Sequence, residues 1–341
     1  MADKKFAVLF DTNSYRQFVS GKKTNEALCE IKALKKMENR KNIQAYGVMV
    51  VALEMLGNLA EGETGVNYRD CLNGLLAMIE HCSDGHGTPP RYTLQPALHI
   101  ANSFFGGVPQ EIENRAKNLM GIAEDLSRDL QTALKHHQEK GTFNTIRTYI
   151  DNEEQVFSTT ITDFIEGVKQ KVVSEHPRIA DRDLRTKLLA YIQTKEFESI
   201  IAKGIIVATA QKLNQGLPEQ EIDKRALKMM EEFPLSAGFH QWICHKIVHD
   251  TIDMQSSTSR KKRWNWLWDY QVAFLVNKHT LDGREVILVT SDGDLIKMLK
   301  DCGYNNKVLT ITQYIDFVKS SGKRQWCFNL CRLLTFFNKV K

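Results

Sequence analysis

Short apolar runs alternate with helical patterns near both ends of the chain. Residues 5–10 form a mostly apolar run that ends at Asp11 and is typical of a buried parallel strand, and residues 285–290 form the clearest strand pattern of the sequence. Shorter strands are expected at residues 42–46 and 307–311. Capping residues and the helical spacing of apolar positions predict helices at residues 12–19, 25–38, 47–59, 264–274 and 295–300. This alternation predicts an α/β fold with a parallel sheet.

The pattern changes between residues 61 and 255, where long helical stretches are separated by turn clusters. The clusters lie at residues 83–90, 104–109, 175–178, 214–219 and 232–238. Residues 204–213 also fit a strand, and they fit a helix equally well. We therefore expect residues 61–255 to be a large all-helical insertion, which divides one discontinuous domain made of residues 1–60 and 256–341.

The overall composition indicates a folded protein without a membrane segment. Of the 341 residues, 42% are hydrophobic and 26% are charged, which excludes a disordered or fibrous chain. No apolar run reaches the length of a transmembrane helix, and the N-terminal region lacks the pattern of a cleaved signal. The seven cysteines include no CxxC pair and suit reduced thiols better than a disulfide framework. We therefore expect a cytoplasmic protein that has no membrane partner.

Charge is distributed unevenly along the chain, although the formal net charge is only +5. Residues 1–60 hold 10 Lys and Arg against 6 Asp and Glu, and residues 256–341 hold 15 against 7. The segment between them, residues 61–255, holds 21 against 28. Because Lys and Arg attract polyanions, the two basic ends favour a phosphate backbone as ligand. The alternative is that helix surfaces carry this charge without any ligand.

Four acidic residues stand out within the two basic ends: Asp11, Glu54, Asp269 and Asp292. Asp11 and Asp292 follow predicted strands, and ligands bind at the carboxyl ends of the strands in a parallel sheet. Glu54 and Asp269 lie on predicted helices that can lean over the same edge. Carboxylates are the ligands that Mg²⁺ and Mn²⁺ prefer, and gathered carboxylates repel one another unless a cation binds or their pKa values rise. The four acids therefore predict a site for Mg²⁺ or Mn²⁺.

The motifs around these acids resemble those of the PIN domain nucleases. In that family a strand ends in an Asp that is often followed two residues later by Asn or Ser, as in residues 11–13 (DTN). The family's helical Glu matches Glu54, and its helical Asp before small and apolar residues matches Asp269. Its T-x-D-x-D turn after a strand matches residues 290–294. The resemblance implies a PIN-like parallel sheet flanked by helices.

The resemblance covers about residues 1–60 and 260–315, and the long segment between Glu54 and Asp269 departs from compact family members. It implies Mg²⁺- or Mn²⁺-dependent hydrolysis of phosphodiester bonds, most often in RNA, and therefore an endoribonuclease. It also implies a role for each matching residue: Asp11 and Asp292 as the strongest metal ligands, Asp269 and Glu54 as supporting ligands or holders of water, Asn13 and Thr290 as groups that orient them, and Asp294 as a fifth ligand or a helix cap.

Other functions and partners stay open at this stage. The resemblance implies a toxin-like or defence effector that an inhibitory or regulatory protein restrains, and the sequence leaves open whether the chain forms a homo-oligomer. Haloacid-dehalogenase-like phosphohydrolases also begin with a strand that ends in Asp, but they carry a second Asp where this chain has Asn13. A catalytically silent RNA-binding or scaffold protein could keep the acids as structural metal ligands.

A basic run, Arg260, Lys261, Lys262 and Arg263, precedes three tryptophans beside Asp269. Positive charge next to aromatic surface suits single-stranded nucleic acid, so we expect the four basic side chains to contact phosphate. The tryptophans either stack on bases or pack between the insertion and the sheet. Histidines and a cysteine at helical spacing in residues 240–249 resemble zinc ligands, but the apolar residues between them favour an ordinary helix.

Overall fold

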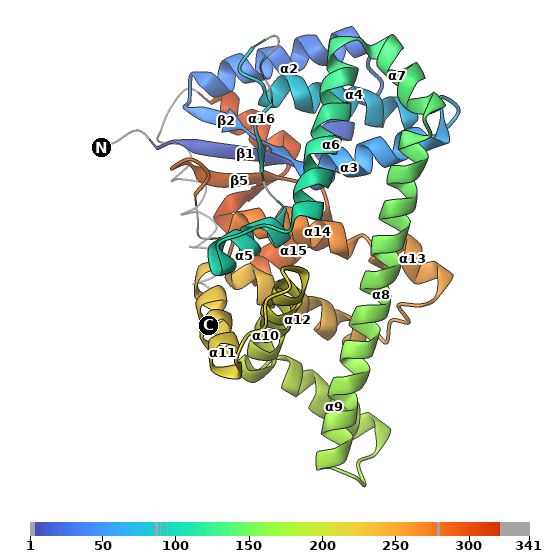
Figure 1. Ribbon diagram of the computed structural model, residues 1–341. Coiled ribbons are helices and arrows are strands. Elements are labelled where there is room, and N and C mark those ends of the chain that lie inside the picture. The colour runs from blue at the N-terminus through green and yellow to red at the C-terminus, as the bar shows by residue number, and fades with distance from the viewer. Residues whose placement is uncertain (1–3, 86–87, 89, 94, 278–279, 321–341) are drawn as a thin grey trace.

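A four-stranded parallel sheet forms the centre of the fold. The computed structural model describes residues 4–85, 88, 90–93, 95–277 and 280–320. All strand pairs in this sheet are parallel and the strand order is β2-β1-β5-β6, so the predicted parallel α/β sheet is confirmed. Strands from the two ends of the chain lie side by side in it (Figure 1). Their bounds are β1 (Phe6–Phe10), β2 (Ile43–Ala45), β5 (Glu285–Val289) and β6 (Val308–Leu309).

The two central strands bring the ends of the chain into register. Phe10 at the end of β1 lies opposite Val289 at the end of β5, and the Asp11 N–H donates to the Val289 carbonyl over 3.1 Å. Consecutive residues of both strands are buried, which means that both faces of the sheet are covered and explains the continuous apolar runs. The carboxyl edge of the sheet therefore places Asp11 beside Thr290.

Helices from several parts of the chain surround the sheet. Between β1 and β2 lie α1 (Thr12–Val19) and α2 (Thr24–Asn39), and α3 (Met49–Asn58) carries Glu54. The next helix, α4 (Tyr68–Cys82), contacts all three of them. The first helix of residues 61–255 thus packs against the helices around the sheet, and the domain boundary at residue 60 stays a prediction.

The later helices of residues 61–255 extend away from the sheet. The long helix α8 contacts α3 and α9, and it runs along one side of the molecule in Figure 1. Helices α9 to α12 fill the lower half of that view, below the sheet. The bounds are α5 (Pro96–Phe105), α6 (Gln110–Arg128), α7 (Leu130–Glu139), α8 (Thr142–Glu175), α9 (Asp181–Ile192), α10 (Lys195–Lys212), α11 (Glu219–Glu232) and α12 (Pro234–His249).

The C-terminal helices return to the sheet. Helix α14, which carries Asp269, contacts both α3 and α15, so the helices that carry three of the four acids are neighbours. None of the described helices has the length and apolar character needed to cross a membrane. The bounds are α13 (Ser257–Arg263), α14 (Trp266–Ala273), α15 (Gly293–Asp301) and α16 (Ile311–Lys319), with 3-10 turns η1 (Leu59–Glu61), η2 (Phe274–Val276) and η3 (Asn305–Lys307).

The sequence prediction of an all-helical segment at residues 61–255 is wrong at one place. Strand β4 (Tyr92–Thr93) pairs in parallel with β3 (Gly47–Val48) as a second, two-stranded sheet. A Cβ atom at Gly47 would lie only 2.9 Å from the Tyr92 ring, so this pairing depends on glycine. Residues 204–213 fall mostly in helix α10, which settles the open choice between strand and helix at that segment.

Candidate active site

Asp11 is held by the groups that follow the two central strands. It caps helix α1, where its Oδ1 accepts from the Ser14 backbone N–H over 2.6 Å. Its Oδ2 accepts from the Thr290 hydroxyl over 2.5 Å, and the residue is 6% exposed. Burial raises the pKa of the Asp11 carboxyl, the hydrogen bonds from Ser14 and Thr290 oppose this, and the charge of Asp292 raises the pKa further. The carboxylate is therefore fixed in one orientation at the sheet edge.

Thr290 joins Asp11 to Asp292. While its hydroxyl donates to Asp11, the same oxygen accepts from the Asp292 backbone N–H over 3.1 Å. Asp292 in turn caps helix α15 through a 2.8 Å bond from the Leu295 N–H to its Oδ1. Two acids at the ends of neighbouring strands are thus tied together by one buried hydroxyl group.

Glu54 reaches the same region from helix α3. The Thr12 hydroxyl, one residue beyond Asp11, donates to Glu54 Oε2. Burial raises the pKa of the Glu54 carboxyl to about 7, and the charges of Asp11 and Glu154 raise it further, while the Thr12 hydrogen bond and the charge of Arg16 lower it. A carboxyl group with such a pKa exchanges protons readily near neutral pH.

Asp269 completes the group from helix α14. Burial raises its pKa well above the ordinary value, and the charges of Asp292, Glu54, Asp11 and Asp294 follow in that order as further causes. Asp269 therefore interacts electrostatically with Asp11, Glu54 and Asp292. The charges that act most strongly on the pKa of Asp269 all belong to acids.

The donor chemistry of this group fits a hard divalent cation, because all its members are carboxylates. Burial and the charges of neighbouring acids raise the pKa values of Asp11, Glu54 and Asp269. Across the described part of the chain, no three His, Cys, Asp or Glu side chains form a compact set that could hold a metal ion. The acids therefore converge electrostatically but are not gathered into a closed ligand shell. Asp11 and Asp292 are the pair most directly linked.

The raised pKa of Glu54 predicts how stability depends on pH. A carboxyl group with a higher pKa in the folded protein than in the unfolded chain binds protons more tightly when folded. Its stabilising contribution is complete below its ordinary value of 4.5 and is lost as the pH rises through about 7. In chelator, we expect the unfolding temperature to fall between about pH 5 and about pH 8, and the variant Glu54→Gln to lose part of this slope. Thermal unfolding followed by circular dichroism measures both slopes, and equal slopes would contradict the assignment.

Two residues expected to assist the acids are exposed. Asn13 lies on α1, and its role as an orienting group stays a prediction. Asp294 is also exposed, in the first turn of α15. The helix cap is Asp292 and not Asp294, because the residue at the strand end has the extended backbone that a cap requires. The capping role predicted as one alternative for Asp294 is therefore wrong.

Several residues at the site escaped the sequence analysis. The sequence could have indicated Thr12 and Ser14, because they lie in the first turn of the helix that Asp11 caps. The Ser14 N–H donates to Asp11, and the Thr12 hydroxyl donates to Glu54. Glu154 could not have been indicated in this way, because it lies on α8, far away in the sequence. Its buried carboxylate accepts from the Trp268 indole N–H over 2.9 Å, directly beside Asp269. Helix α8 thereby contributes a fifth acid to the surroundings of Glu54.

The basic run and its tryptophans are largely occupied by contacts within the protein. Trp264, Trp266 and Trp268 are each at most 3% exposed, so they pack inside the protein and do not present a stacking surface. Arg260 pairs with Asp151 over 3.1 Å, and the Arg263 guanidinium lies over the ring of Trp266. The side chains of Lys261 and Lys262 lie outside the described part of the structure. Contact of this run with phosphate stays a prediction.

The histidine and cysteine group of residues 240–249 belongs to an ordinary helix, α12. Cys244 is fully buried, and His240 Nδ1 bonds the Ser236 carbonyl one turn earlier. The His245 and His249 rings stack on each other. These contacts agree with the prediction of an ordinary helix.

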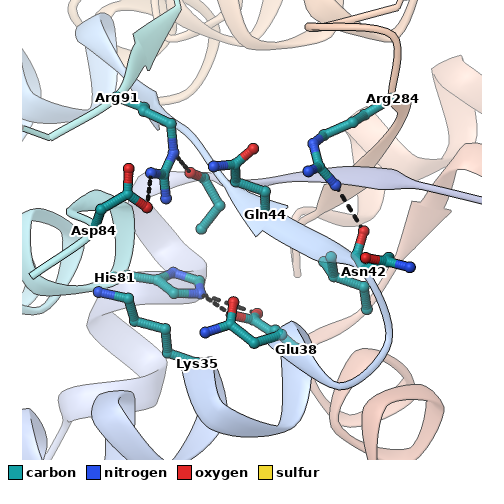
Figure 2. Close-up of a pocket in the computed structure, with 11 residues that line it drawn as sticks. Lys35, Glu38, Asn42, Gln44, His81, Asp84, Arg91 and Arg284 are labelled. Carbon is teal, nitrogen blue, oxygen red and sulfur yellow. Dashed lines mark hydrogen bonds and ion pairs between the residues drawn. The ribbon is translucent and has the colours of Figure 1, made fainter.

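A polar cavity of about 120 Å³ lies at the opposite end of the strands (Figure 2). Asn42 and Arg284, which precede β2 and β5, line it, and the Arg284 guanidinium donates to the Asn42 carbonyl over 2.8 Å. Arg91 pairs with Asp84 and donates to the carbonyl of Ala45 in β2. The outer edge of β2 is therefore covered by Arg91.

One wall of this cavity is a buried chain of titratable side chains. His81 Nε2 bonds both Glu38 oxygens, at 2.8 and 3.0 Å, and both residues are 1% exposed. The Tyr314 hydroxyl donates to Glu38 over 2.5 Å, and the Tyr15 hydroxyl lies 3.1 Å from His81 Nδ1. This chain joins α1, α2, α4 and α16 beneath the sheet residue Phe10, whose ring contacts three of its members.

Comparison of the sequence with protein-family models and curated proteins, and of the structure with solved structures, finds no match. The function has to be argued from the fold and from the arrangement of the acids.

Proposed function

We propose that the protein is a metal-dependent endoribonuclease of the PIN type. The observation that carries the proposal is the junction of Asp11 and Asp292 at the carboxyl ends of neighbouring parallel strands, where Thr290 bonds both residues. Helices α3 and α14, which contact each other, add Glu54 and Asp269 to the same edge. This is where α/β folds bind their ligands. The basic ends of the sequence support a polyanionic substrate.

The residues present have distinct tasks in this proposal. Asp11 and Asp292 would hold the cation, with Asp269 as a further ligand, and Thr290 and Ser14 keep the Asp11 carboxylate oriented. Glu54, with its pKa of about 7, is suited to accept a proton from an attacking water. A bound Mg²⁺ or Mn²⁺ would supply acidification of water and stabilisation of negative charge at the phosphate.

Cleavage of a labelled RNA in the presence of Mn²⁺ tests the proposal. The variant Asp11→Asn keeps the shape of the helix cap but removes one charge, and we expect it to lower the cleavage rate at least about a hundredfold. Asp301→Asn, on the exposed end of α15, is the matched control and should cleave at the wild-type rate.

Three outcomes distinguish a nuclease from an RNA-binding protein and from a phosphohydrolase. Loss of cleavage in Asp11→Asn alone supports the nuclease. Wild-type protein that binds RNA, leaves it intact and binds no Mn²⁺ would refute it in favour of a catalytically silent RNA-binding protein. A covalent phosphoenzyme formed from a small phosphoester would instead indicate a phosphohydrolase that uses Asp11 as its nucleophile.

A further inference from the structure

Arg16 lies beside the acids on the same face of helix α1 as Thr12. The two residues are four positions apart, so their side chains are neighbours on the helix surface, and Thr12 donates to Glu54. The positive charge of Arg16 acts to lower the pKa of Glu54 on α3 and of Cys71 on α4. Among the groups that act most strongly on the pKa of Glu54, Arg16 is the one with a positive charge.

The contacts of Arg16 leave part of its hydrogen-bonding capacity unused. One terminal nitrogen, Nη2, donates to the Asn67 side-chain oxygen. The Nε atom is buried and has no hydrogen-bond partner among the described residues. A buried N–H of a charged group without an acceptor is costly, and such a group in a structure calls for an explanation. Two arginines of α6, Arg115 and Arg128, each pair with a glutamate one helical turn earlier. Arg16 has no such ion pair with a carboxylate of the described residues.

The surroundings of Arg16 are open to a ligand on one side. Asn67 ends the loop that follows η1, and its neighbour Val66 is 95% exposed. Arg16 itself is partly exposed. The next residue, Gln17, accepts from the Ser291 hydroxyl over 2.7 Å, so the same helix turn also reaches the residue before Asp292. Helix α1 therefore spans the acidic group from Glu54 to Asp292.

We propose that Arg16 contacts a non-bridging phosphate oxygen of the RNA strand bound at the acids. This inference rests on the proposed nuclease function and names a substrate-binding residue for it. Four carboxylates repel a phosphodiester, and a guanidinium at their rim offsets this repulsion where the strand enters. The fork of N–H groups on Arg matches phosphate oxygens, and the Arg16 side chain is partly exposed, with Asn67 as the acceptor for its Nη2.

The competing role for Arg16 is to anchor the loop through Asn67, and a set of three variants separates the two roles. Asn67→Ala removes the anchor and keeps the guanidinium. Arg16→Ala removes both, and Arg16→Lys keeps the charge without the fork. Fluorescence anisotropy of a 5′-labelled single-stranded RNA gives the affinity at several salt concentrations. Calcium replaces manganese in this measurement so that the strand stays intact.

We expect Arg16→Ala to weaken RNA binding about tenfold and to reduce the slope of log affinity against log salt by about 0.7, as one lost phosphate contact requires. Arg16→Lys should keep the slope, and Asn67→Ala should change neither quantity. Affinity for Mn²⁺ alone, from titration calorimetry, should stay within about twofold in all three variants, because Arg16 holds no metal.

The outcomes distinguish this inference from the proposed function. If the wild-type protein cleaves RNA and Arg16→Ala keeps both affinity and slope, the phosphate contact is refuted and the nuclease stands. The contact is also refuted if Asn67→Ala weakens binding as much as Arg16→Ala. If the wild-type protein binds RNA but never cleaves it, the nuclease is refuted, and a reduced slope in Arg16→Ala still establishes the contact.

Discussion

Replacing Asp269 by asparagine is expected to abolish RNA cleavage and to stabilise the metal-free protein at the same time. Burial raises the pKa of the Asp269 carboxyl well above its ordinary value, and the charges of Asp292, Glu54 and Asp11 raise it further. Asparagine has the same shape and no charge, so the repulsion disappears while the packing of α14 is kept. We expect the cleavage rate to fall at least about a hundredfold and the free energy of unfolding to rise by about 1 kcal/mol or more.

Urea denaturation in chelator near neutral pH measures the stability change, and cleavage of labelled RNA with Mn²⁺ measures the activity. Asp301→Asn serves as control for the loss of one negative charge on an exposed helix position. The expected signature is a pair of opposite changes in Asp269→Asn and no change in the control. Wild-type cleavage by Asp269→Asn, or equal stability of the two variants, would contradict the convergence of the acids.

Removal of Glu38 is expected to cause the largest loss of stability in the described part of the protein. Its carboxylate is 1% exposed and accepts from both His81 and Tyr314. Truncation to alanine leaves two buried donors without an acceptor, and each such group costs about 1–3 kcal/mol. Glu38→Gln keeps an acceptor oxygen for Tyr314 and should cost less.

A double-mutant cycle with His81→Ala tests whether the two residues act as a pair. We expect the double variant to be less destabilised than the sum of the single variants, with a coupling of about 1–3 kcal/mol. Urea denaturation supplies the four free energies. Additive losses would show that the two side chains contribute independently. RNA affinity of the folded Glu38→Gln protein should match wild type, because the described hydrogen bonds of Glu38 go to His81 and Tyr314 and to none of the four acids.

The acids after β1 and β5 could be predicted, because each follows a continuous apolar run that is recognisable from neighbouring residues alone. Asp11 directly follows β1 and Asp292 lies three residues beyond the end of β5, and the buried runs before both acids are visible in the sequence. The connection between them through Thr290 depends on the register of β1 and β5, which only the folded sheet determines. The sequence therefore identifies these acids but not the hydroxyl group that joins them.

The contacts of α8 and α14 could not be predicted, because they arise where distant helices meet. Glu154 and Trp268 bond each other across a long stretch of chain, and neither belongs to a motif. For the three tryptophans, the sequence favours packing between the insertion and the sheet over an exposed aromatic surface. Their burial follows from α14 lying between α3, α12 and α15, an arrangement that no local pattern contains.

The pairing of β1 with β5 has a consequence for the timing of synthesis. A ribosome that has made β1 must translate the long helical segment before β5 exists to cover that strand's second edge. At 5–20 residues per second this interval lasts roughly 15–55 s. For most of this interval the nascent chain lacks both Asp269 and Asp292. The group of four acids is therefore complete only after β5 has been made.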